Sequence, residues 1–346
     1  MAQHTSKREL GRGERVLPGL WRLRLPLPWP GVPHCNAWAI ASGSGVVLID
    51  TGLHEPGSIG QLERAMDQVN LRLDHVRLVA ITHAHTDHWG QAATICDRAG
   101  CELWMHPNHE HATRTTGDPE AVLAQRLEIG RQSGVPETAL DRYAERFQKG
   151  GQSGVARVIE PDQLLLDGVK IETDLGEWTT YETPGHAPSH VCLFAPERRL
   201  LISGDHVLGR VSLYYDYGWT PDPVGEYLRS LKVVDALDAR LGLSGHGRPF
   251  VDVHGHVDAS RGLVQQRIDA VLGALSDRPG TAAEIAPAVH GEPLSDRNAS
   301  RLLAETLCYL THLERLEKVV REEDGGKPVW RLSAPGPAIP DPAAQP

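Results

Sequence analysis

Apolar and polar positions along the first two thirds of the chain form many short patterns. Alternation over 20–25 predicts a strand with one buried face, and apolar blocks at 45–50 and 76–81 predict buried strands. Similar patterns predict further strands at 37–40, 102–105, 155–159, 164–166, 169–173, 178–183, 190–194, 200–203 and 241–244. Helical periodicity predicts helices at 58–70, 89–99 and 224–238. The mixture predicts an α/β fold in which strand ends feed the functional loops.

One segment interrupts the strand pattern. Residues 107–150 are polar and helix-forming and carry no strand signal. We predict that they form a helical insertion within a first domain spanning 15–256. A long insertion in a compact domain usually serves function, so we expect it to cover a pocket. The polar residues 1–14 predict a disordered lead.

The pattern changes again after residue 256. Three helical stretches come first, at 257–276, 281–290 and 296–315. A hairpin around the Gly-Gly turn at 325–326 follows them. This order is typical of a winged helix, which we place at 257–332, and we expect it to serve packing or dimerisation. The Ala- and Pro-rich segment 333–346 predicts a disordered tail.

Composition excludes several classes of function. The chain has 45 acidic and 35 basic residues, a net charge of −10, which disfavours a large nucleic-acid surface. The five cysteines form no CxxC pair, and the polar N-terminus has no apolar signal-peptide segment, so we expect a cytoplasmic protein. Since no apolar run approaches about 18 residues, we expect no membrane span.

Potential metal ligands gather directly after a predicted buried strand. The segment 83–88 reads His-Ala-His-Thr-Asp-His, four potential ligands in six residues. In an extended segment His83 and His85 point the same way, whereas Asp87 and His88 can face a second centre. One ion cannot readily take all four, so the segment predicts two metal ions. Imidazole and carboxylate suit zinc, our first expectation, and also iron or manganese.

Three later positions complete the ligand set, each at a strand end beside glycine, which allows a sharp backbone turn. They are His186, Asp205 and His246. If Asp205 bridges, one ion takes His83, His85, His186 and Asp205, and the other takes Asp87, His88, His246 and Asp205. Each ion then keeps room for a shared water.

The order of these motifs resembles that of the metallo-β-lactamase superfamily. Asp50-Thr51-Gly52, the HxHxDH segment and the later Gly-His, Gly-Asp and Gly-His pairs follow one another over residues 50–246. The resemblance implies a four-layered αβ/βα sandwich with a dimetal site at one edge and the same ligand assignment. It also implies that Asp50 is an acidic residue that orients the ligands.

Details of the motifs favour particular branches of the superfamily. His85 stands where flavodiiron-type oxidoreductases carry Glu, and Asp205 is a bridging residue that true zinc β-lactamases lack. The set therefore resembles glyoxalase II, lactonases and phosphodiesterases. Residues 302–317 resemble the winged-helix appendage of the β-lactamase-like protein 2 group, which includes an endoribonuclease.

Other polar and aromatic side chains near the motifs allow more than one role. We expect support of the ligands or packing from two histidines, His190 and His206. We expect the histidines that open the insertion to be exposed: His106, His109 and His111. Four aromatic residues either cap the core or line the pocket: Tyr214, Tyr215, Tyr217 and Trp219. His54 and Glu55 could line the pocket, although we favour a surface turn for them. Residues 253–256, a rival HxH, are expected in a solvated loop.

The ligand set predicts a hydrolase. A water shared by two ions loses its proton near neutral pH and attacks a carbonyl or phosphoryl group. We expect a small thioester, lactone or ester as substrate, with Asp87, Asp205 and Asp50 as the catalytic carboxylates. A phosphodiesterase or endoribonuclease with the same ligands is the alternative, although Arg210, Lys232 and other basic residues near the motifs are scattered.

The expected partner is thus a small molecule rather than a nucleic acid or a membrane, and a homodimer is left open. A non-catalytic module that binds DNA is the third possibility. The intact ligand set and the acidic charge disfavour it.

Overall fold

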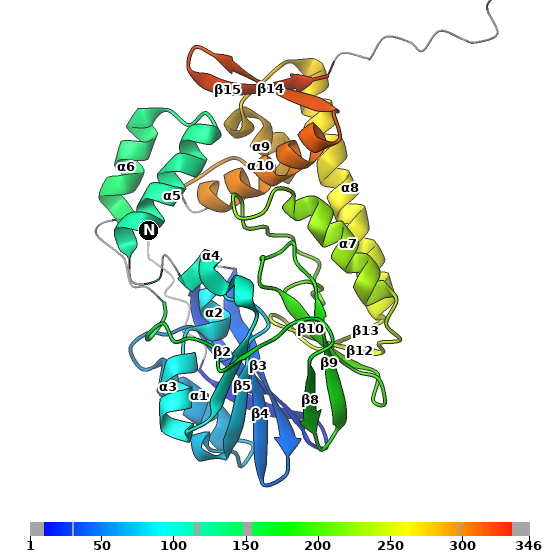
Figure 1. The fold of residues 1–346 in the computed structure, drawn as a ribbon. Helices are drawn as coiled ribbons and strands as arrows, with labels where there is room; N and C mark the ends of the chain where they lie inside the picture. Colours follow the sequence, from blue (N-terminus) through cyan, green and yellow to red (C-terminus); the bar gives the residue numbers. More distant parts are fainter. Residues whose placement is uncertain are drawn as a thin grey trace, which may run out of the picture.

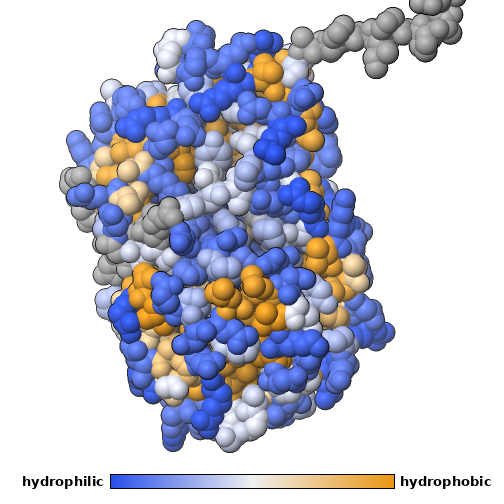
Figure 2. All heavy atoms as spheres, in the orientation of Figure 1, coloured by the Kyte–Doolittle hydropathy of each residue, from blue (hydrophilic) through white to orange (hydrophobic). Residues whose placement is uncertain are grey.

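The structure is a computed structural model that describes residues 10–29, 31–113, 116, 118–147, 154–296 and 298–333 (Figure 1). Two sheets lie face to face in the lower part of the molecule, and a group of helices lies above them. Figure 2 shows that hydrophilic residues cover most of the face in view.

The first sheet contains the strands of the N-terminal half. Its order is β1 (Arg12–Leu17), β2 (Leu20–Trp29), β3 (Val32–Ser42), β4 (Gly45–Ile49), β5 (Val76–Ala80), β6 (Glu102–Met105) and β7 (Gln163–Leu164). Strands β1 to β4 form an antiparallel meander, and β4 to β7 run parallel.

The second sheet is built from later strands. Its order is β13 (Phe250–Val251), β12 (Leu241–Ser244), β11 (Leu200–Gly204), β10 (Val191–Ala195), β9 (Gly176–Glu182) and β8 (Lys170–Thr173). Only the pair β11 and β12 is parallel among its described pairs. Parallel pairing places the carboxyl ends of β11 and β12 at the same edge, a suitable place for a site.

Three apolar clusters define the layers. Between the sheets, Trp38 of β3 and Trp178 of β9 belong to one buried cluster. Outside the first sheet, Met66 belongs to a second cluster with the helices α1 (Ser58–Asp67) and α3 (Ala92–Ala99). Outside the second sheet, a third cluster includes Leu231 of α7 (Pro223–Asp235) and Val264 of α8 (Val253–Asp277). The layers therefore run helix, sheet, sheet, helix, and the expected αβ/βα sandwich is confirmed.

The helices above the sandwich come from two distant parts of the chain. The insertion contributes a short 3-10 turn (Pro107–His109), α4 (Glu110–Thr113), α5 (Pro119–Gln132) and α6 (Glu137–Phe147). The C-terminal part contributes α9 (Ala282–His290), α10 (Ala299–Arg315) and the hairpin of β14 (Val319–Asp324) and β15 (Lys327–Leu332). The two groups touch, since Ala283 N donates to Ser133 O at 2.9 Å.

The C-terminal elements follow the order that the sequence predicts, three helices and then a hairpin. The identity of this part as a winged helix stays a prediction. In the described residues no helix is both long enough and apolar enough to cross a membrane.

Two expectations about the N-terminal half are wrong. Residues 12–14, assigned to a disordered lead, belong to β1, because this edge strand pairs with β2 and its Glu14 binds Arg22 at 2.7 Å. Residues 1–9 of that lead and most of the tail, 334–346, lie outside the described residues. Residues 155–159 form no strand, because Ala156 N donates to Gly90 O rather than to a neighbouring strand.

The rival HxH segment is also not a loop. Helix α8 begins at Val253, earlier than predicted, because the side chain of Asp252 caps it by accepting from Gly255 N. His254 lies in the first turn of that helix and contacts Asp235 at 2.9 Å. It therefore faces away from the predicted ligands.

Candidate metal centre

The predicted ligands meet at the edge of the sandwich where strands of both sheets end. His83 and His85 follow β5, and the short helix α2 (Thr86–Trp89) carries Asp87 and His88. His186 follows β9, whereas Asp205 and His246 follow the parallel strands β11 and β12. The seven side chains thus come from loops and one short helix at strand ends of a rigid scaffold, and both sheets contribute.

The first group of potential ligands contains three histidines. His83, His85 and His186 each offer a ring nitrogen, and these atoms lie within 4.8 Å of one another. His186 Nε2 lies 3.0 Å from His85 Nδ1. This is the trio that the sequence assigns to one ion.

The second group lies beside the first. The ligand atoms of Asp87, His88 and His246 also lie within 4.8 Å of one another. His246 Nε2 lies 3.2 Å from the Asp87 carboxylate, and His88 Nε2 lies 3.5 Å from it. This trio is the one assigned to the other ion.

Asp205 lies between the two groups. Its Oδ2 is 3.1 Å from His246 Nε2 and 3.8 Å from His186 Nε2. Its Oδ1 is 3.7 Å from His88 Nε2. A carboxylate that approaches both trios in this way has the position of a bridging ligand.

Unpartnered buried atoms test whether this site fits metal ions. His83 Nε2, His88 Nε2 and Asp205 Oδ1 are buried and have no hydrogen-bond partner among the described residues. Such atoms are costly to leave unsatisfied, and imidazole nitrogen and carboxylate oxygen are atoms that bind zinc. The donor set therefore fits divalent metal ions.

The charges of the metal-free site are strongly perturbed. Burial opposes the charged form of His88, but the carboxylates of Asp87, Asp205 and Asp50 outweigh it and raise its pKa to about 9. Burial and the neighbouring His85 lower the pKa of His186 to about 4. Without metal the second group therefore holds protons, which metal binding must displace.

Asp50 orients two of the histidines. Its Oδ2 lies 2.9 Å from His88 Nδ1, so it can accept a hydrogen bond from Nδ1–H. The other ring nitrogen, Nε2, is then free to bind metal. Its carboxylate also accepts from Thr82 N at 2.8 Å and from Thr82 Oγ1, which in turn contacts His83 Nδ1 at 3.0 Å. Asp50 thus lies behind the ligands, as the sequence implies, and does not contact the cavity directly.

Two glycines allow the ligands to approach one another. A Cβ atom at Gly245 would collide with the Asp205 carboxylate and with the His88 ring. A Cβ atom at Gly204, whose φ is +47°, would lie 2.5 Å from His190 Nε2. The glycines that flank the motifs are therefore required by space as well as by the turn.

The loop of His246 is held by the first sheet, which the sequence does not indicate. His246 Nδ1 lies 2.9 Å from His34 O. The Asn36 side chain donates to Ser244 O at 2.8 Å, and Arg22 donates to Gly247 O. These polar contacts from β2 and β3 fix the orientation of His246.

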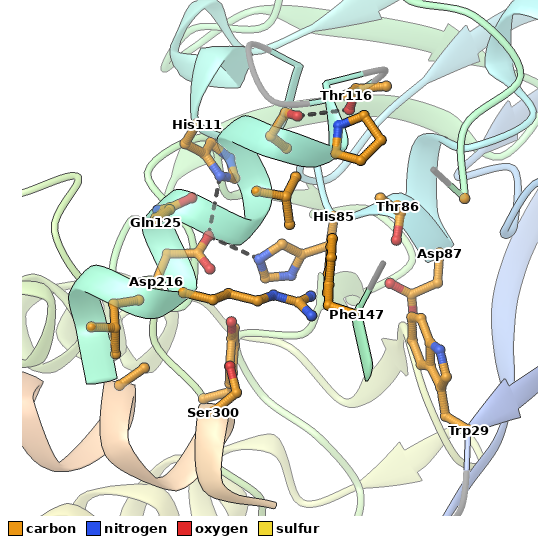
Figure 3. A pocket seen from close by; sticks show the side chains of 18 of the residues that line it. Trp29, His85, Thr86, Asp87, His111, Thr116, Gln125, Phe147, Asp216 and Ser300 are labelled. Atoms are coloured by element: carbon orange, nitrogen blue, oxygen red, sulfur yellow. Dashed lines mark hydrogen bonds and ion pairs between the residues drawn. The ribbon is translucent and has the colours of Figure 1, made fainter. Parts of the chain in front are cut away.

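Asp216 and His111 also form part of the site and were not predicted. Asp216 Oδ2 lies 2.9 Å from His85 Nε2 and 3.1 Å from His111 Nδ1 (Figure 3). His111 Nε2 contacts Ser189 Oγ at 2.8 Å. Since His85 faces His186 through Nδ1, Asp216 holds the far side of a ligand ring.

The expectation of exposed histidines at the start of the insertion is therefore wrong. His106, His109 and His111 are all buried, because each contacts a polar group of the sandwich or of its own turn. His190 and His206, which lie near predicted ligands in the sequence, differ in their contacts. His190 Nε2 contacts Asp205 N at 3.1 Å and so supports a predicted ligand, whereas His206 is packed in the core without a ligand contact.

A cavity of about 1220 Å³ opens above the ligands. Figure 3 shows Gln125 and Phe147 of the insertion around the same space as His85 and Asp87 of the sandwich. For its described residues, the insertion covers the pocket as expected. Ser300 of α10 also lines the cavity.

The aromatic residues after β11 divide between the two expected roles. Tyr214, Tyr217 and Trp219 line the cavity, whereas Tyr215 is fully buried in the core. His54 and Glu55 line the cavity too, so their expected place on a surface turn is wrong. The turn that carries them folds inward because His54 N donates to Gly154 O at 2.9 Å.

Comparisons with known proteins agree with this fold. The family model described as "Metallo-beta-lactamase superfamily" matches residues 30–246. The chain is 25% identical to the "Probable metallo-hydrolase YqjP" of Bacillus subtilis (strain 168) over 301 residues, 83% of this chain and 90% of the relative. It is 24% identical to the "Atrochrysone carboxyl ACP thioesterase" of Aspergillus chevalieri over 304 residues, 85% of this chain and 80% of the relative.

Solved structures extend the likeness to nearly the whole chain. A metallo-beta-lactamase family protein from Thermus thermophilus aligns with a TM-score of 0.78 and 27% identity, covering 92% of this chain and 100% of that one. A beta-lactamase domain protein from Burkholderia ambifaria aligns with a TM-score of 0.79 and 26% identity, covering 95% and 96%. The match therefore includes the C-terminal helices as well as the sandwich.

Proposed function

Because the chain belongs to the metallo-beta-lactamase superfamily, we propose that it is a dinuclear metal-dependent hydrolase of a small carbonyl compound, first of all a thioester. Lactones and other esters belong to the same reaction class. One observation carries the proposal: Asp205 approaches both ligand trios, and His83 Nε2, His88 Nε2 and Asp205 Oδ1 are buried without a hydrogen-bond partner among the described residues.

The residues of the two trios would hold the ions. His83, His85 and His186 offer neutral nitrogens to one ion, and Asp87, His88 and His246 serve the other. Two divalent ions, most favourably zinc, supply an acidified water and polarise the scissile carbonyl when they are bound. Asp205 lies where it can hold both ions and accept a proton after the attack.

Polar contacts behind the ligands keep them in place. Asp50 fixes the His88 ring, and Asp216 fixes the His85 ring, each at 2.9 Å. Such contacts select the ring nitrogen that faces the metal and raise the basicity of the ligand. We therefore assign orientation of the site, rather than direct attack on substrate, to Asp50.

The cavity supports a carbonyl substrate over a phosphodiester. Its wall includes Tyr214, Tyr217 and Trp219, an aromatic surface that suits a compact organic ligand. Among the described residues its arginines are Arg126 and Arg146, and Arg146 is paired with Asp296. A nuclease would need several cations for successive phosphates. The relative named as a thioesterase supports the same choice.

The test combines metal analysis with a substrate panel. Protein purified without chelator should contain about two equivalents of metal, and chelation should abolish hydrolysis until metal is restored. Thioesters, lactones, bis-(nitrophenyl) phosphate and single-stranded RNA are then compared at equal metal content. We expect turnover of thioesters. His254→Ala, which changes an exposed histidine away from the centre, serves as the control variant.

Two results would overturn the proposal. Activity that survives complete removal of metal would exclude a metal-dependent mechanism. Efficient RNA cleavage that weakens steeply with salt, without hydrolysis of any acyl substrate, would establish the phosphodiesterase alternative instead.

A further inference from the structure

Arg126 is a cavity residue that the hydrolysis chemistry leaves without a role. It lies on α5 of the insertion and lines the cavity above the proposed metal centre. Its Nη1 donates to the Tyr143 hydroxyl at 2.9 Å, and its guanidinium carbon lies 5.3 Å from the centre of the Phe147 ring. Both partners are neutral, so in the described part of the chain the positive charge of Arg126 has no paired carboxylate.

A second described arginine of the cavity wall, Arg146, differs in this respect. Arg146 forms an ion pair with Asp296. The nearby carboxylate of Asp216 is shared by His85 and His111. Of the two arginines that line the cavity in the described part of the chain, Arg126 is thus the one that keeps most of its donors for a ligand. An arginine offers five N–H groups in a fixed plane.

Arg126 also shares its cavity with the proposed metal centre. His85, Asp87 and Tyr214 line the same space. The ring centre of Tyr214 lies 5.6 Å from those of His85 and His186. Arg126 and two of the predicted ligands thus face one cavity, so one substrate can contact both.

We propose that Arg126 binds an anionic group, a carboxylate or a phosphate, at the end of the substrate remote from the scissile carbonyl. Arginine recognises both groups through paired N–H···O bonds. The cavity of about 1220 Å³ has room for an elongated ligand. The nature of the reacting carbonyl rests on the proposed function, whereas the position of Arg126 does not.

The anion has two possible sources, which paired substrates distinguish. A carboxylate on the acyl group is tested by succinyl- against butyryl-N-acetylcysteamine. A phosphate on the thiol is tested by acetyl-coenzyme A against acetyl-N-acetylcysteamine. In at least one pair the wild-type protein should prefer the anionic member in kcat/KM, and Arg126→Gln should reduce that preference by about 10- to 100-fold.

A matched control lies on the same insertion. Arg142 is an exposed arginine of α6 whose Nε donates to Thr138 O, and it does not line the cavity. Arg142→Gln should keep the wild-type preference. Arg126→Lys, which keeps the charge but loses the planar donors, should retain part of it.

Binding of non-hydrolysable thioethers separates this inference from the proposed function. The dissociation constants of S-(3-carboxypropyl)- and S-butyl-N-acetylcysteamine and of S-butyl-coenzyme A are measured by calorimetry on the metal-loaded protein. If no thioester is hydrolysed, the proposed function fails while these constants still decide the role of Arg126. An anionic preference that is absent in the wild type, or unchanged in Arg126→Gln, would overturn the inference.

Discussion

The metal centre and the wall that faces it across the cavity are built in different ways. The candidate ligands lie at strand ends of two sheets, where buried backbone and close-packed glycines fix them. The facing wall comes from α5, α6 and α10, and its side chains, such as Arg126 and Ser300, reach the cavity from helix surfaces. Chemistry is thus placed on the rigid part of the fold, and selection of substrate on a part that can vary without moving the ligands.

One of the polar contacts between the insertion and the sandwich reaches a candidate ligand. His111 belongs to α4 of the insertion and touches Asp216, which touches the ligand His85. This contact makes the cover part of the metal centre. Three sets of substitutions, taken from the largest expected effect to the smallest, test whether the metal centre and the helical region have separate roles.

Removal of the shared carboxylate should have the largest effect. Asp205→Ala should lower kcat/KM by more than about 1000-fold and lower metal content, because the proposed ligand of both ions is lost. His206→Ala, next in sequence but without a ligand contact, is the control and should stay within about tenfold. Activity and metal content are measured on the same preparations. Equal losses in the two variants would refute the bridging role of Asp205.

Weakening the contact between the regions should have an intermediate effect. Asp216→Asn removes the carboxylate that accepts from the His85 ring, and His111→Ala removes the residue that holds this carboxylate. Each change should lower metal affinity by about 10- to 100-fold. The affinity is measured by competition with a chromophoric chelator. Glu182→Gln is the control, since the Glu182 carboxylate lies 3.0 Å from His106 of the insertion but touches no candidate ligand. Metal affinity that is equal in all three variants would show that the cover plays no part in the centre.

A change inside the helical region should affect stability rather than chemistry. Burial raises the pKa of Glu305 in α10 to about 7, above its ordinary value of 4.5. Its protonated form is therefore favoured in the folded state, so its stabilising effect is complete below the unfolded pKa and is lost as pH rises through 7. Between pH 6 and 7 this loss is about 1 kcal/mol.

Glu305→Gln should remove that pH dependence. Urea unfolding of the wild type and the variant at pH 6 and 7 measures it as the change in the difference of their free energies of unfolding. Parallel pH profiles would show that Glu305 is ionised in the folded protein. Metal content should be the same in both, since Glu305 contacts Tyr309 and not a ligand.

The candidate ligands at the strand ends were predictable because the sequence motifs that mark them are local. The HxHxDH segment carries four potential ligands in six residues, and each later ligand stands directly after a glycine. The layered fold followed from the same alternation of strands and helices and is confirmed. The assignment of each ligand to an ion stays a prediction. The structure brings both predicted trios together, but it also groups His83 with His88 and Asp205, and His85 with His111 and Asp216.

Asp50 and His190 were predicted as supporting residues, but Asp216, His111 and Asn36 were not, because their contacts are distant in sequence. Asp216 lies 131 residues from His85, and Asn36 lies 208 residues from Ser244, whose carbonyl it binds. His111 looked exposed because its segment is polar, and only the fold shows that Asp216 and Ser189 bury it. Strand β1 was missed for a related reason, since its mixed sequence, RGERVL, is stabilised by pairing with β2.

The contribution of both sheets to the centre has a consequence for synthesis of the protein in the cell. The HxHxDH segment leaves the ribosome first, and His246 follows roughly 160 residues later, which takes roughly 10 to 30 seconds at ordinary rates of translation. Until His186 and Asp205 follow, the early histidines lack the partners assigned to the first ion, and the second group is complete only with His246. Under the proposed function, metal capture is therefore a late step of maturation, and it would join two halves of the chain that are made at different times.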